Sequence, residues 1–187
     1  MATEKKLDCV ILGLLRHEEL TGYEIKKRMD TTLKYFWGAS YGSIYPTLND
    51  LVVRGLAVKR ADAQSNRNKQ IYAITDGGRI YLKEWLAQPV EKDELRYETL
   101  LKLFFGCEGG AEQALAHIAA FRKKVEAQMP YFLGAAQSLE QCINENPEHQ
   151  YYWLTVQFGI QTYHAYLEWC RMAEEILSEN PSKKFMK

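Results

Sequence analysis

The chain has 187 residues, with 24 Lys and Arg against 24 Asp and Glu, so its formal net charge is zero. Its 47% hydrophobic and 26% charged residues are the composition of a globular protein and exclude a disordered one. No apolar run approaches the ~18 residues that a membrane span needs, and no signal-peptide pattern is present. The four cysteines form no Cys-x-x-Cys pair, so we expect a cytoplasmic protein without disulfides or a membrane partner.

The charges are distributed unevenly along the chain. Residues 1–90 carry 14 basic and 10 acidic side chains, a net charge of +4, whereas residues 91–187 carry 10 and 14, a net charge of −4. The zero total by itself argues against a nucleic-acid-binding protein. The split instead predicts that the basic half meets a polyanion and that the acidic half meets another partner.

Two helices are predicted near the start of the chain. Apolar residues at i, i+3, i+4, i+7 and i+8 predict an amphipathic helix over residues 3–16. Thr21, with Glu24 three residues later, predicts a capping box at the start of a second helix. That helix is expected to continue to about Tyr35, with its basic residues toward solvent.

The third helix is predicted to begin near Ser40. Pro46 narrows this placement, because a proline deep in a helix costs about 3 kcal/mol and is tolerated in the first turn. The true first turn is therefore expected close to Gly42-Ser43. Gly55 occupies the position at which a residue of left-handed conformation often ends a helix.

A change of periodicity after the third helix predicts two short strands, residues 56–60 and 69–74, joined by a polar loop. Thr75 then caps a fourth helix that ends near Pro89. The order helix, helix, helix, hairpin, helix is that of a winged helix-turn-helix, whose third helix lies in the major groove of DNA. Residues 1–90 are therefore predicted to form such a DNA-binding domain.

The outward positions of the third helix and of the hairpin are the candidate DNA contacts. Hydroxyl and amide groups can donate to phosphate oxygens or read base edges, and basic residues of the wing can bind the backbone. The candidates are Ser40, Tyr41, Ser43, Tyr45, Pro46, Asn49, Arg67 and Lys69. The alternative is a protein-interaction adaptor that uses a helix-turn-helix shape without touching DNA. The polar helix face and the basic wing favour DNA.

Motifs over residues 7–88 are similar to those of PadR-family transcriptional regulators. They are Leu12-Gly13-Leu14-Leu15, Thr21-Gly22-Tyr23-Glu24-Ile25, Tyr45-Pro46-Thr47-Leu48 and Tyr72-Ala73-Ile74-Thr75. The second half resembles, more loosely, a C-terminal region of the virulence activator alpha type through residues 100–105. The resemblance implies a homodimer that binds an operator in double-stranded DNA, usually as a repressor released by a small-molecule effector or another signal. It implies DNA contacts at Ser43, Tyr45, Pro46, Arg67 and Lys69.

The second half is predicted to be helical. A short helix over residues 95–105 is followed by a long one over residues 111–143, in which Pro130 predicts a kink or a break. The last helix, residues 148–177, has apolar and aromatic residues nearly all around it, so another subunit must cover part of its surface. Residues 91–187 are therefore expected to form a helical dimerisation domain, which is also the candidate effector domain.

Four aromatic residues of the last helix admit two interpretations. They are Trp153, Tyr163, Tyr166 and Trp169. They either form the core of the dimer or line a pocket for an aromatic or planar effector. The dimer core is favoured, because no motif at these positions identifies a ligand.

Catalytic and metal-binding patterns are absent from the sequence. The four histidines show no His-Glu-x-x-His spacing, and there is no Gly-x-Ser-x-Gly elbow, Walker loop or dinucleotide fingerprint. We therefore expect no enzyme, no metal and no cofactor. Taken together, the patterns predict a mainly α-helical protein with a small β-hairpin wing.

Overall fold

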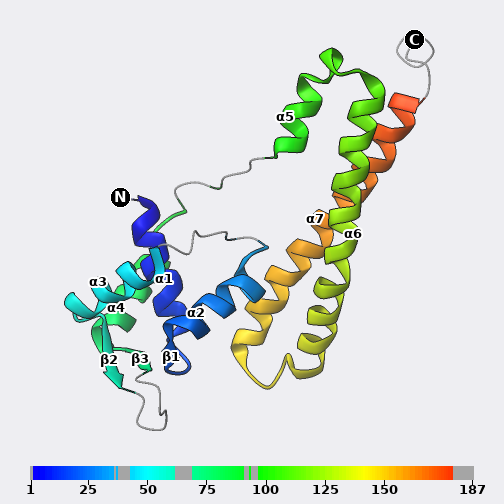
Figure 1. Ribbon diagram of the computed structural model, residues 1–187. Helices are drawn as coiled ribbons and strands as arrows, with labels where there is room; N and C mark the ends of the chain where they lie inside the picture. The colour runs from blue at the N-terminus through cyan, green and yellow to red at the C-terminus, as the bar shows by residue number, and fades with distance from the viewer. Residues whose placement is uncertain are drawn as a thin grey trace. The chain divides into compact units, whose positions relative to one another are not determined.

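The computed structural model describes residues 2–35, 37, 43–61, 69–90, 93 and 97–178. The chain divides into two compact units, Met1–Asp93 and Glu94–Lys187, and each has a hydrophobic core of its own. Figure 1 shows that, among the described residues, the strands lie in the first unit and the second unit is helical. The predicted class, mainly α-helical with a small β wing, is confirmed. Of the described helices, none has the length and apolar character to cross a membrane.

Unit 1 combines helices with a small antiparallel sheet. Its elements are α1 (Ala2–Leu14), β1 (Leu20–Thr21), α2 (Gly22–Arg28), the π-helix η1 (Met29–Leu33), α3 (Ile44–Val53), β2 (Ala57–Ala61), β3 (Gln70–Ile74) and α4 (Asp76–Leu86). β3 lies between the other two strands, with Leu20 opposite Tyr72 and Ala57 opposite Ile74. The sequence predicted the β2–β3 hairpin but not β1, because two residues show no periodicity.

The core of unit 1 forms where α1 packs against α3 and α4. Ile11, Leu48 and Leu51 are fully buried there, which confirms the predicted inward faces of α1 and α3. On α4, Leu82 is buried, whereas Leu86 is 64% exposed. Part of the apolar surface of α4 therefore lies outside this core.

The start of α2 carries the predicted capping box. The Thr21 hydroxyl accepts a hydrogen bond from the Glu24 backbone N–H at 3.2 Å, and the Glu24 carboxylate accepts one from the Thr21 backbone N–H at 2.8 Å. The backbone and hydroxyl hydrogen bonds of Thr21 lower the pKa of the Glu24 carboxyl. Because Thr21 also pairs with Ile71 of β3, the cap fixes α2 to the sheet.

Replacing Thr21 with alanine is expected to lower the free energy of unfolding by about 1 kcal/mol, since it removes the helix cap. The variant Glu24→Gln isolates the charge. The pKa of this carboxyl is lower in the folded state than its ordinary 4.5, so its contribution is complete above that value and is lost as the pH falls through the folded-state pKa. Urea unfolding is expected to separate Glu24→Gln from the wild type near neutral pH and not at strongly acidic pH. An equal difference in the free energy of unfolding at both pH values would contradict a stabilising role of the Glu24 charge.

The end of α3 is anchored to α1. Gly55 has a φ of 70°, as predicted for the residue that ends the helix. The preceding residue, Arg54, donates to the carboxylate of Asp8 at 2.9 Å, and Asp8 is only 5% exposed. Arg54 also pairs with Asp50 at 3.0 Å and lies over the ring of Tyr81. One side chain thus joins α3 to α1 and α4.

Arg54→Ala is expected to destabilise unit 1 by about 1.5 kcal/mol, because a buried carboxylate loses the guanidinium that compensates its charge. Asp50→Ala removes the solvent-exposed partner of the same arginine and is expected to cost less than about 0.5 kcal/mol. Urea unfolding of the two variants measures the difference. Equal losses would show that the contact with Asp8 does not dominate.

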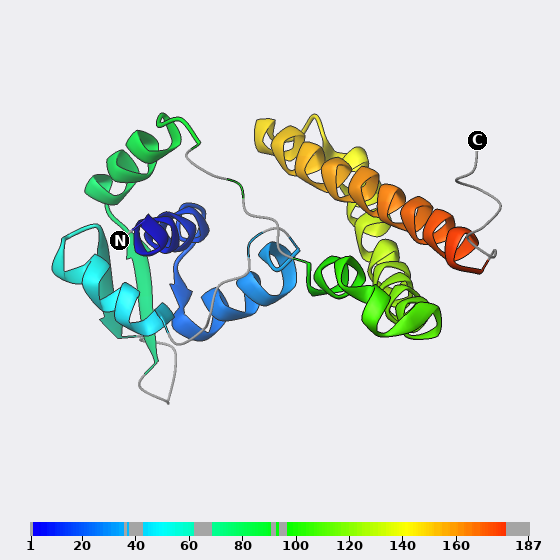
Figure 2. The same ribbon diagram turned by 90° about the horizontal axis from the view of Figure 1, so that it is seen from above.

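Unit 2 consists of α5 (Glu98–Phe104), the short 3-10 helix η3 (Gly106–Glu108), α6 (Gly110–Cys142) and α7 (Pro147–Ser178). The two long helices run side by side as an antiparallel hairpin, as Figure 2 also shows. α6 continues through Pro130, so a break there was the wrong prediction. Pro130 is on the exposed side of α6, between the buried residues Met129 and Phe132. Packing of these neighbours holds the helix together.

Candidate nucleic-acid interface

The outward face of α3 is polar and lies open to solvent. Tyr45, Pro46 and Asn49 are exposed, and Tyr45 is 56% exposed. Ser43 immediately precedes the helix and is half-buried; its carbonyl accepts a hydrogen bond from the Thr47 hydroxyl at 2.7 Å. Pro46 lies in the first turn, and the buried residues of α3 lie on the opposite side of the helix. The outward face therefore carries hydroxyl, amide and ring groups. Such groups can contact base edges in a major groove.

Tyr45 is held in place by α2 and by the sheet. A methyl group placed on Gly22 would lie 2.6 Å from the Tyr45 ring, so only a glycine allows this close approach. Tyr45 also lies close enough to the buried Tyr72 of β3 to help raise the pKa of Tyr72, whose main cause is burial. Gly22 is part of the Thr-Gly-Tyr-Glu motif, but no local pattern in the sequence indicates its contact with Tyr45.

The wing lies at the same end of the sheet as the start of α2. Lys69 is exposed just before β3, and its charge contributes to the low pKa of Glu24, after the two Thr21 hydrogen bonds. Arg60 of β2 forms an ion pair with Glu19, just before β1. Arg60 is therefore partly compensated, whereas Lys69 presents positive charge to solvent. Three of the predicted contacts, Ser40, Tyr41 and Arg67, lie outside the described residues.

The four aromatic residues singled out on α7 do not form one group. Tyr163 and Tyr166 have ring centroids 5.7 Å apart, and Phe121 of α6 contacts both Tyr166 and Trp169, at 5.6 and 6.1 Å. Trp153 lies apart and donates its indole N–H to Glu140 at 3.3 Å. All four are half-buried.

Hydrogen bonds fix the two tyrosines between the helices of unit 2. The hydroxyl of Tyr166 is bonded to that of Tyr97, and the hydroxyl of Tyr163 donates to Gln128 of α6. Burial and the bond to Tyr97 raise the pKa of Tyr166. These side chains therefore take part in packing within one chain.

Other aromatic and apolar residues of α7 face solvent. Tyr151, Leu154 and Phe158 are 70%, 60% and 71% exposed. Their spacing of i, i+3 and i+7 places them on one stripe of the helix. Exposed apolar stripes of this kind mark surfaces that another protein covers.

Comparisons with known proteins agree with this architecture. Residues 11–84 match the model of the transcriptional regulator PadR-like family, and residues 95–178 match that of the virulence activator alpha C-terminal region. The negative transcriptional regulator PadR of Bacillus subtilis (strain 168) is 37% identical over 102 residues, which are 53% of this chain and 56%, just over half, of that protein.

Two solved structures of Bacillus subtilis PadR are similar along most of the chain. The structure in complex with operator DNA has a TM-score of 0.76 at 28% identity and covers 91% of this chain and 98% of that one. The structure in complex with p-coumaric acid has a TM-score of 0.70 at 27% identity, with 92% and 98% covered. The chain therefore carries a PadR-like domain over residues 11–84 and a region of the virulence activator alpha C-terminal type over residues 95–178.

Proposed function

We propose that this chain is a homodimeric repressor that binds an operator in double-stranded DNA and is released by a small molecule. Residues 1–90 act as the DNA-binding domain and residues 91–187 as the dimerisation domain. The observation that carries the proposal is the exposed face of α3, on which Tyr45, Pro46 and Asn49 stand clear of a packed core. The operator complex of the related Bacillus subtilis PadR supports it.

The two parts of the interface contribute different interactions with DNA. α3 enters the major groove, where Tyr45 and Asn49 read base edges and Pro46 contacts a thymine methyl. Lys69 and Arg67 of the wing bind phosphates, which positions the protein without specifying sequence. Two subunits place their α3 helices in half-sites about 34 Å apart, one turn of the duplex.

The second subunit covers the exposed stripe of α7. Tyr151, Leu154 and Phe158 are each at least 60% exposed on one stripe of the helix, and contiguous exposed apolar residues are typical of interaction surfaces. A twofold axis lets the stripe of one chain pack against unit 2 of the other. Dimerisation then brings two DNA-binding domains to one operator.

Release by a small molecule is the regulatory part of the proposal. It is supported by the structure of Bacillus subtilis PadR in complex with p-coumaric acid. A ligand that prefers the conformation unable to bind DNA lowers operator affinity in proportion to that preference.

Gel shifts with the DNA upstream of the gene test the function, at salt between about 50 and 200 mM. We expect salt-sensitive, sequence-selective binding. Lys69→Ala is expected to weaken binding to operator and random DNA alike and to reduce the salt slope by about one unit per subunit. Lys83→Ala removes an exposed lysine of α4 and serves as the control. Failure to bind any DNA selectively would favour the adaptor over the repressor.

A further inference from the structure

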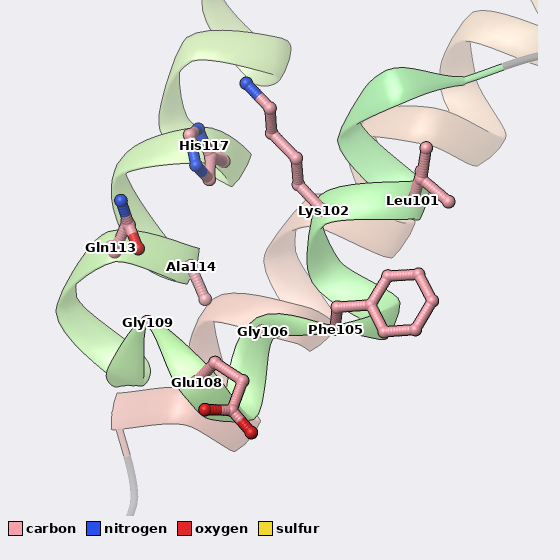
Figure 3. A pocket seen from close by; sticks show the side chains of 9 residues that line it. All are labelled: Leu101, Lys102, Phe105, Gly106, Glu108, Gly109, Gln113, Ala114 and His117. Atoms are coloured by element: carbon pink, nitrogen blue, oxygen red, sulfur yellow. The ribbon is translucent and has the colours of Figure 1, made fainter.

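Two pockets adjoin in unit 2, next to α5, η3 and the first turns of α6. The first has a volume of about 520 Å³ (Figure 3), and the second, of about 460 Å³, extends to the last turns of α7. Gly106 and Ala114 line both pockets. A methyl group placed on Gly106 would lie 4.0 Å from that of Ala114. Two of the smallest residues therefore separate spaces whose volumes are typical of small-molecule sites.

The first pocket has a rim of nitrogen-bearing side chains. Lys102, Gln113 and His117 lie along it, whereas the carboxylate of Glu108 lies at the opposite end and points away (Figure 3). The Lys102 ammonium is 3.0 Å from Glu98 and retains two further N–H groups for a ligand. The hydrogen bond from Lys102, with the charges of Lys102 and His117, lowers the pKa of the Glu98 carboxyl. The two basic side chains are thus close to one another.

The second pocket is more apolar than the first, whose lining includes Leu101 and Phe105 besides its polar rim. Its walls include Leu103, Trp169, Met172, Ile176 and Leu177, and none of the described residues that line it is charged. Apolar groups enter such a pocket because they leave water. A ligand that fills both pockets must therefore be polar at one end and apolar at the other.

We propose that the two pockets together bind an alkyl carboxylate, which is an unbranched apolar chain with a carboxylate head group. The head group accepts hydrogen bonds from Lys102, Gln113 and His117. The chain crosses over the surface of Gly106 and Ala114, which lie too close together for it to pass between them, into the apolar pocket. The proposal rests on the proposed function, whose releasing small molecule it identifies by chemical class.

The position of the pockets gives this ligand a route to regulation. α5, which supplies Lys102 and Leu103, is the first helix after the junction between the two units. A ligand held by α5 and α6 together stabilises the packing of these two helices against each other. Its binding can therefore change the stability of the unit that is proposed to hold the dimer together.

Isothermal titration calorimetry of the full chain with decanoate, at concentrations below micelle formation, tests the head group. Decanoate is expected to bind at least about tenfold more tightly than the uncharged decanamide. Lys102→Met is expected to weaken decanoate at least about fivefold and decanamide less than about twofold. Lys123→Met, which removes an exposed lysine of α6 away from both pockets, is the control. Equal affinity of the acid and the amide would overturn the assignment.

A series of hexanoate, octanoate and decanoate tests the apolar pocket. Each added pair of CH2 groups is expected to raise the affinity about tenfold in the wild type. Met172→Glu introduces a charge into the second pocket at a residue that is 46% exposed, so the fold can accept it, and is expected to abolish this gain. His164→Glu, on the same helix but outside both pockets, is expected to keep it. Unchanged chain-length dependence in Met172→Glu would overturn the site.

The same protein samples are assayed by gel shift on the operator, first without and then with decanoate. Normal operator binding with no heat from decanoate overturns the ligand site and leaves the repressor intact. Loss of selective operator binding in the wild type overturns the proposed function, whatever calorimetry shows. Release of the operator by decanoate, absent in Lys102→Met and Met172→Glu, supports both.

Discussion

Replacing Tyr45 with alanine is expected to lower operator affinity about 100-fold and to narrow the difference between operator and random DNA. Each subunit loses a ring and a hydroxyl at the start of α3, worth about 1 to 1.5 kcal/mol per half-site, and a dimer loses both. Tyr45 is 56% exposed, so the fold is expected to tolerate the change. Fluorescence anisotropy with labelled operator and scrambled DNA measures both affinities.

The variant Gly22→Ala tests whether the position of the Tyr45 ring matters, without changing Tyr45 itself. The added methyl group would meet the Tyr45 ring at 2.6 Å and displace it, so operator affinity is expected to fall although no DNA contact is removed. Gly13→Ala in α1 is the matched control, because nothing lies within 4 Å of the added methyl and alanine favours a helix. If both glycine variants bound operator like the wild type, the position of Tyr45 would not matter for recognition.

Phe158→Glu is expected to convert the dimer into monomers and to lower operator affinity by more than about 100-fold. The substitution places a charge in the exposed stripe of α7, at its most exposed residue, since Phe158 is 71% exposed. In a dimer that charge is buried without compensation, which costs several kcal/mol. A monomer contacts one half-site only, so the second half-site no longer contributes through the linked subunit. Sedimentation equilibrium and gel shifts measure the two consequences.

His164→Glu is the control for the dimer. His164 is exposed on α7 six residues after Phe158, about 120° away around the helix axis, so it lies off the stripe. A dimeric Phe158→Glu protein would place the interface elsewhere. A chain that ends at Asn146 lacks α7 entirely. It is a second test of the interface, because it too is expected to be monomeric.

Local signals in the sequence predicted much of unit 1. The capping box of Thr21 and Glu24, the first turn before Pro46 and the left-handed Gly55 each depend on a few neighbouring residues. Short stretches of sequence are therefore enough to predict these three features. All three are found in the structure.

Features that depend on distant residues could not be predicted in this way. The close contact of Gly22 with Tyr45 and the ion pair of Arg54 with Asp8 join elements that are far apart in sequence. Of the kink or break predicted at Pro130, the break was wrong for the same reason, since packing of α6 along α7 outweighs one missing hydrogen bond. For Tyr45, Pro46 and Asn49, the sequence predicted the helix and its outward face. It did not predict the contact between Tyr45 and Gly22.

Thr21 belongs to the sheet and to a helix at the same time, since it pairs with β3 and caps α2. Ordering of β1 against β3 therefore also fixes the residue that caps α2. Backbone amides of β3 and of the first turn of α2 are accordingly expected to exchange with solvent as one cooperative unit.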